Sequence, residues 1–149
     1  MNMIMETTRF GALEYGSEQI ISFVTGIPGF KQYVTFMIVT IEDSPFQYLQ
    51  SLENGELAFI IVSPFEFYPD YEFDLSEQVK DELKITEEEG LEIYNIVRVP
   101  EELSSATINL LAPIIINGPK QLAVQYILSN SPYSTQHQLF SKNAVTGGE

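Results

Sequence analysis

A short apolar run at residues 57–62, LAFIIV, constrains the fold of this chain more than any other stretch. It is too short for an ordinary helix, contains β-branched residues, and is bounded by Asn54-Gly55 and by Pro64. These features predict a buried, central β-strand. Beyond Pro64 the composition changes abruptly to aromatic and acidic residues.

Other short apolar segments also have the length and composition of strands. They are residues 20–24, 34–41, 91–99, 108–116 and 122–128, together with residues 7–15, which we expect to form one edge strand with a bulge at Gly11. Pro28-Gly29 suits the central positions of a type II turn. Pro113 interrupts the most apolar segment and predicts a bulge or a sheet edge there. Asn117-Gly118 is a strong hairpin signal.

Two segments have helix-start signals. Ser44-Pro45 combines an N-cap residue with proline at the first helical position, and predicts a short helix ending near Asn54. Asp74 and Glu77 have the spacing of a capping box, and they precede an amphipathic segment at residues 75–84. We therefore expect a mainly β fold, an antiparallel barrel-like sheet with two short helices, because closing the sheet removes its exposed edges.

The length of 149 residues is typical of a single domain with its own core, spanning residues 1–149. Residues 129–149 are small and polar, and predict a loosely packed C-terminal tail in which Tyr133, Leu139 and Phe140 provide the anchors. The chain has no cysteine, no signal-peptide pattern and no apolar run long enough for a membrane span. We expect a cytoplasmic protein with no membrane partner.

The charge is strongly acidic and unevenly distributed. Twenty-one acidic residues against seven basic ones give a net charge of −14. Residues 66–102 hold thirteen acids and three bases, a net of −10, whereas residues 103–148 hold two lysines and no acid. This charge disfavours direct binding of nucleic acid, and self-repulsion favours a monomer when the protein is free. The asymmetry fits either a solvated face or a surface that attracts a cationic protein.

Catalytic and metal-binding signatures are weak. His137, the single histidine, lies between glutamines in the polar tail, and no nucleotide-binding or nucleophile-elbow motif occurs. Asp70, Glu72 and Asp74 match the first positions of an EF-hand loop, but the required glycine and terminal glutamate are missing. A carboxylate pair in a barrel mouth could still serve a glycosidase, although chance pairs are expected among so many acids. We expect no enzyme activity and no cofactor.

Three blocks of the chain resemble the flagellar assembly factor FliW family. They are GIPGF at residues 26–30, the stretch from Ser44 to Leu75, and NLLAPIIIN at residues 109–117. The resemblance implies a small non-enzymatic barrel with two partners: the C-terminal region of flagellin, and CsrA, a dimeric RNA-binding repressor of flagellin translation. It also implies that flagellin sequesters the protein, and that the free protein antagonises CsrA. The alternative is a flagellin secretion chaperone without direct control of CsrA.

The segment after Pro64 is the candidate partner-binding surface, because aromatic anchors and a rim of charge coincide there. The candidate contact residues are Phe65, Phe67, Tyr68, Asp70, Tyr71 and Glu72, with Pro113 and Asn117 as a second, weaker site where a strand edge could accept a flagellin segment. The aromatic rings could instead plug one end of the core. Whether the two partners share one site or use two coupled sites stays open.

Overall fold

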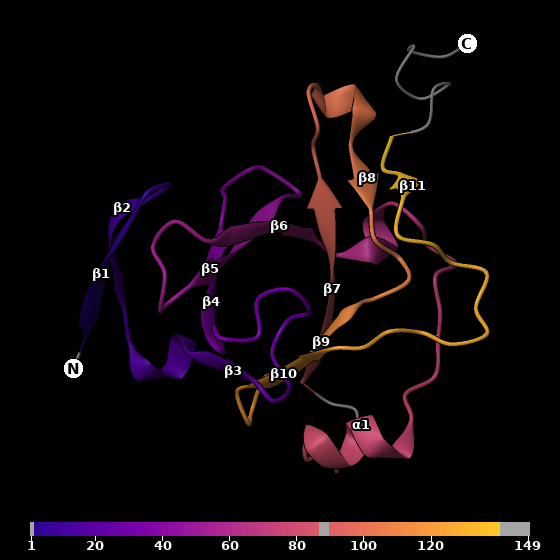
Figure 1. Cartoon of the computed structure of the whole chain (residues 1–149), viewed down its shortest axis with the longest axis horizontal. Coiled ribbons are helices and arrows are strands. Elements are labelled where there is room, and N and C mark those ends of the chain that lie inside the picture. Colours follow the sequence, from indigo (N-terminus) through magenta and orange to yellow (C-terminus); the bar gives the residue numbers. More distant parts are fainter. Residues whose placement is uncertain (1, 87–89, 141–149) are drawn as a thin grey trace.

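Seven strands close into a barrel in the computed structural model, which describes residues 2–86 and 90–140 (Figure 1). The order around the barrel is β7-β6-β5-β4-β3-β10-β9, and β9 pairs again with β7 to complete the ring. The barrel strands are β3 (Ile21–Phe23), β4 (Thr35–Thr40), β5 (Gln47–Ser51), β6 (Ala58–Val62), β7 (Leu91–Arg98), β9 (Ile114–Asn117) and β10 (Leu122–Gln125). The expected barrel-like, mainly antiparallel sheet is confirmed, with β3–β10 as a parallel pair.

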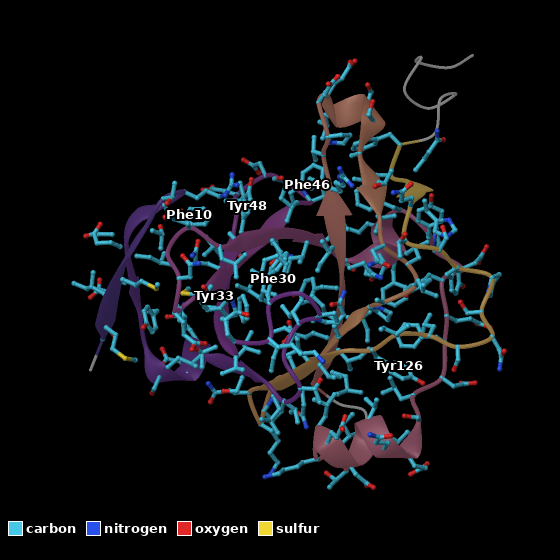
Figure 2. All side chains as sticks on the ribbon, in the orientation of Figure 1. Phe10, Phe30, Tyr33, Phe46, Tyr48 and Tyr126 are labelled. Atoms are coloured by element: carbon cyan, nitrogen blue, oxygen red, sulfur yellow. The ribbon has the colours of Figure 1, made fainter. Side chains whose placement is uncertain are left out.

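The barrel interior is filled by large apolar side chains from almost every strand. Phe36, Leu49, Ile61 and Ile114 are fully buried and belong to one cluster. The Gly26–Phe30 turn covers this cluster: the φ angle of Gly29 is +87° and Phe30 N donates to Ile27 O at 2.7 Å, as the type II turn requires. Phe30, labelled in Figure 2, lies on this covering turn and is 37% exposed, and its ring meets that of Phe59 edge-on at 5.2 Å.

The first predicted strand is a separate hairpin. Residues 7–15 were expected to form one edge strand, but β1 (Met3–Thr7) and β2 (Gly11–Tyr15) pair with each other outside the barrel. Gly11 has a φ of +65°, and the Thr7 hydroxyl donates to its carbonyl, so the glycine belongs to the turn and not to a bulge. Phe10 packs edge-on against Tyr48 at 5.3 Å, which attaches the hairpin to β5 (Figure 2).

The helix predicted after Ser44 is absent, and β5 occupies that stretch. The Ser44 hydroxyl accepts a hydrogen bond from Phe46 N at 3.0 Å, but the chain then pairs with β4 on one side and β6 on the other. The start signal therefore produced only a local turn. Pairing on both edges, together with burial of Leu49, outweighs the local helix preference.

The second predicted helix forms as α1 (Glu77–Glu82), the one α-helix among the described residues. Its N-cap is Ser76, whose hydroxyl accepts from Val79 N at 3.2 Å, and not Asp74 as the capping-box spacing suggested. Val79 and Leu83 pack on Ile115 and Val124, so α1 covers the barrel beside β9 and β10.

Strand β7 changes its neighbour halfway along one edge. Residues 91–94 pair with β9, whereas Val97 and Arg98 pair with the short β8 (Thr107–Ile108). The chain between β8 and β9, which ends in Pro113, leaves the ladder as the interrupting proline predicted. Asn95 lies at the switch and is fully buried, and its Nδ2 donates to Asn109 O at 2.7 Å.

The chain after β10 returns to the barrel. Strand β11 (His137–Gln138) pairs with β8, Leu139 N donates to Ala106 O at 3.0 Å, and Leu139 is buried. Residues 141–149, the rest of the predicted tail, lie outside the described residues.

Replacing Asn95 with alanine should destabilise the barrel, because the partly buried carbonyl of Asn109 loses its side-chain donor. We expect Asn95→Ala to lower the free energy of unfolding by about 2–3 kcal/mol. Urea unfolding followed by circular dichroism measures this, with the exposed Lys120→Ala as control. A change equal to that of the control would contradict the structural role of Asn95.

Candidate protein-interaction site

The aromatic, acidic segment leaves the barrel directly after β6. Pro64 begins a short 3-10 helix, η2 (Pro64–Glu66), since its fixed φ suits the first helical position. The Pro64 carbonyl accepts from Tyr68 N at 2.8 Å, and the Tyr68 carbonyl accepts from Tyr71 N at 2.9 Å. Two successive turns therefore bring the chain back along the outside of the barrel toward α1 (Figure 1).

Tyr71 fixes this segment to the barrel. It is 4% exposed, and its hydroxyl donates to Leu110 O at 2.7 Å and accepts from Asn95 Nδ2 at 3.3 Å. Its ring also lies 4.7 Å from that of Tyr133. Burial raises the pKa of Tyr71 to about 12, because the charged phenolate is poorly solvated there. Tyr71 therefore supports the site from inside and contributes to the wall of a neighbouring groove, and its burial leaves little of the exposed surface that we expected it to offer a partner.

The other predicted aromatic residues are more exposed than Tyr71, to different degrees. Phe65 is 44% exposed and is the one ring of this group that presents a large apolar area to solvent. Phe67 packs against Phe140 at 5.9 Å, and the Tyr68 hydroxyl donates to the Gln138 carbonyl. Phe67 and Tyr68 thus hold the C-terminal segment in place while each keeps a partly exposed edge.

The acidic residues of the segment all reach the surface. Asp70, Glu72 and Asp74 are exposed, while Tyr71 and the partly buried Phe73 between them face the barrel. The structure thus separates the two residue types onto opposite sides of one segment. The carboxylates among the described residues 66–82 are Glu66, Asp70, Glu72, Asp74, Glu77, Asp81 and Glu82. The salt bridge found here, Lys80 to Glu77 at 3.6 Å, leaves most of this charge uncompensated.

The second predicted site is buried. Pro113 and Asn117 are not exposed, and β9 has β10 on one edge and β7 on the other, so it offers no free edge to a flagellin segment. Asn117 Nδ2 donates instead to Leu83 O at 2.7 Å, which caps the C-terminal end of α1. The apolar sequence around Pro113 thus marked a barrel strand and not an interface.

A groove that the sequence did not indicate lies beside the acidic segment. It has a volume of about 490 Å³ and runs between this segment, α1 and the start of β7. Its apolar lining includes Phe65, Leu75, Ile85, Leu91 and Ile93, and Glu72 and Asp74 stand on its rim. In the sequence, the alternation of apolar and acidic residues from Tyr71 to Leu75 was the one pattern that could have predicted the side of the groove formed by this segment.

The site shows no arrangement typical of a metal centre. No group of three or more histidine or acidic side chains within residues 2–86 and 90–140 is placed to hold a metal ion. His137 Nε2 accepts from Ser134 N at 2.8 Å, so this nitrogen is occupied in a turn. No helix in the described part of the chain is long and apolar enough to cross a membrane.

The structure is therefore a closed barrel that carries an exposed acidic segment and an apolar groove on its outer surface. A family model described as FliW protein matches residues 4–139. The flagellar assembly factor FliW of Desulfitobacterium hafniense (strain DSM 10664 / DCB-2) is 43% identical over 146 residues, covering 97% of this chain and 96% of its own. That of Alkaliphilus metalliredigens (strain QYMF) is 41% identical over 142 residues, covering 94% and 88%.

A solved structure is similar over nearly the whole fold. The crystal structure of a flagellar assembly factor FliW aligns with a TM-score of 0.88 at 38% identity, covering 94% of this chain and 99% of that chain. The chain therefore belongs to the FliW family of flagellar assembly factors, as the three sequence blocks indicated.

Removing the Tyr71 hydroxyl tests its role as an anchor. Tyr71→Phe keeps the ring but leaves the buried Leu110 carbonyl without this donor, so we expect a loss of about 1–3 kcal/mol in the free energy of unfolding at pH 7. Urea unfolding measures the loss, and Tyr15→Phe in the outer hairpin is the matched control. An unchanged unfolding midpoint would show that the hydroxyl does not anchor the segment.

The raised pKa of Tyr71 also predicts an alkaline dependence of stability. The folded state retains the phenol proton to about pH 12, whereas the unfolded chain loses it near pH 10. The stability conferred is fully present below pH 10 and falls as the pH rises toward 12. Urea midpoints between pH 9 and about 12 should fall less steeply in Tyr71→Phe than in the unmodified protein. Parallel curves would contradict this.

Proposed function

We propose that this protein is a cytoplasmic, non-enzymatic flagellar assembly factor that binds CsrA and relieves its repression of flagellin translation. Flagellin that has not been exported would occupy the protein through its C-terminal region, and export would release it to act on CsrA. The observation that carries this proposal is the row of exposed, largely uncompensated carboxylates on an anchored segment.

The electrostatic argument follows from what an RNA-binding partner must present. A protein that holds phosphates needs basic surface, and that surface attracts carboxylates at long range. Asp70, Glu72 and Asp74 supply negative charge, while Phe65 supplies an exposed apolar contact beside them. Once docked, the acidic protein lowers the affinity of CsrA for RNA through its field, without having to fill the RNA-binding surface.

Calorimetric titration with CsrA at low and raised salt tests this proposal. We expect binding that weakens as salt increases, because exposed charges are screened, and that disappears when flagellin is already bound. Absence of CsrA binding together with preserved flagellin binding would reduce the function to that of a flagellin secretion chaperone.

Charge reversal at the centre of the acidic segment gives a sharper test. Glu72→Lys should weaken CsrA binding by about tenfold or more and leave the unfolding midpoint unchanged, because the side chain is exposed. Glu14→Lys on β2 produces the same change in net charge on the outer hairpin and is the matched control. Equal affinities for the two variants at physiological salt would contradict a local contact at Glu72.

A further inference from the structure

The segment from Tyr71 to Leu75, here called the strap, has the side-chain pattern of a strand but belongs to no sheet. Tyr71 is buried, Phe73 and Leu75 are partly buried, and Glu72 and Asp74 between them are exposed. Such alternation is the signature of extended backbone with one face on a core. Figure 1 shows the strap descending toward α1 outside the barrel strands.

The backbone of the strap is largely unpaired. Glu72 N donates to the Tyr133 hydroxyl at 3.2 Å, but no hydrogen bond joins the N–H or carbonyl groups of residues 73–75 to another described residue. Strand-like backbone with unpaired groups is a template for a further strand. Its position is nevertheless fixed, because Tyr71 is bonded to Leu110 at one end and Ser76 caps α1 at the other.

Space for an added strand exists beside the strap. The groove of about 490 Å³ lies on its α1 side, and apolar side chains of Ile85, Leu91 and Ile93 line it. A second hollow of about 360 Å³ on the other side combines the polar residues 129–131 with Tyr126, Leu128, Pro132 and Tyr133. The α1 side is the larger of the two and has the aliphatic side chains of Leu75, Ile85, Leu91 and Ile93, so its lining suits an apolar side chain better.

The charge pattern selects the occupant. Glu72 and Asp74 face outward two positions apart and make no salt bridge with any described residue, and the groove's lysine, Lys80, is already paired with Glu77. In an added strand, alternate side chains would lie opposite these carboxylates while the residues between them point toward the apolar lining. We propose that the strap binds an extended peptide with basic residues at alternate positions and apolar residues between them, by strand addition along its α1 side.

This inference rests on the proposed function in assigning the acidic segment to partner recognition, and it adds the backbone geometry and the sequence pattern of the partner. A cationic partner could dock on the carboxylates without any ordered backbone pairing. The two modes differ in their dependence on peptide N–H groups, so the experiment must vary these groups while keeping the charge constant.

The probe is a fluorescein-labelled octapeptide of alternating arginine and valine, titrated by fluorescence anisotropy. Two further peptides carry N-methyl groups, on the arginines in one and on the valines in the other. Only alternate residues of an added strand bond to its neighbour, so one methylated peptide should bind about tenfold or more weakly while the other binds nearly normally. Equal binding of all three peptides, equal losses in both methylated ones, or no binding at all would overturn strand addition.

Protein variants locate the site. Glu72→Gln combined with Asp74→Asn should lower the affinity for the peptide without N-methyl groups by about tenfold at low salt. Glu101→Gln combined with Glu102→Gln removes the same charge near the opposite end of β7, and should leave the affinity unchanged. Equal effects of both pairs would overturn the assignment. Titration of CsrA with the same proteins tests the proposed function separately. If CsrA still binds while the peptide does not, strand addition is wrong and the proposed function stands.

Discussion

The fold depends on hydrogen-bond partners for the backbone at the point where β7 stops pairing with β9 and begins to pair with β8. Between β8 and β9 the chain cannot continue the ladder, and buried backbone groups without partners would be costly. Asn109 Oδ1 accepts from the N–H groups of Leu111 and Ala112, each at 3.1 Å, while Asn95 and Tyr71 donate to the carbonyls of Asn109 and Leu110. Three side chains thus replace the missing ladder bonds, and β9 can return to β7 and close the barrel.

The same network attaches the acidic segment to the barrel. Tyr71 is hydrogen-bonded to Leu110 and Asn95 where β7 changes its neighbour, and the exposed carboxylates of Asp70 and Glu72 lie on either side of it. Phe67 and Tyr68 extend this support by contacting Phe140 and Gln138 in the C-terminal segment. Binding to an anchored segment costs less conformational entropy than binding to a loop that has to become ordered.

Local signals in the sequence predicted the elements whose formation is decided locally. The strand before Pro64, the Pro28-Gly29 turn and the hairpin at Asn117-Gly118 all appear in the structure, because turn chemistry and β-branched residues act within a few positions. The helix predicted after Ser44 does not form, because that segment pairs with strands on both sides and this pairing outweighs its local helix signals. In the site, composition located the aromatic, acidic segment but did not distinguish the exposed Phe65 from the buried Tyr71, since inward direction depends on where the chain turns after β6.

In the proposed function, charge and shape would contribute different parts of partner recognition at this surface. At physiological salt the Debye length is about 8 Å, so carboxylates farther than that from a bound partner mainly affect the rate of encounter. Glu72 and Asp74 lie on the rim of the apolar groove itself, where a bound partner partly excludes water and screening is weaker. In the proposed function, the broad acidic charge would favour any cationic protein, whereas the groove and its two rim carboxylates would discriminate among such proteins by the pattern of their side chains.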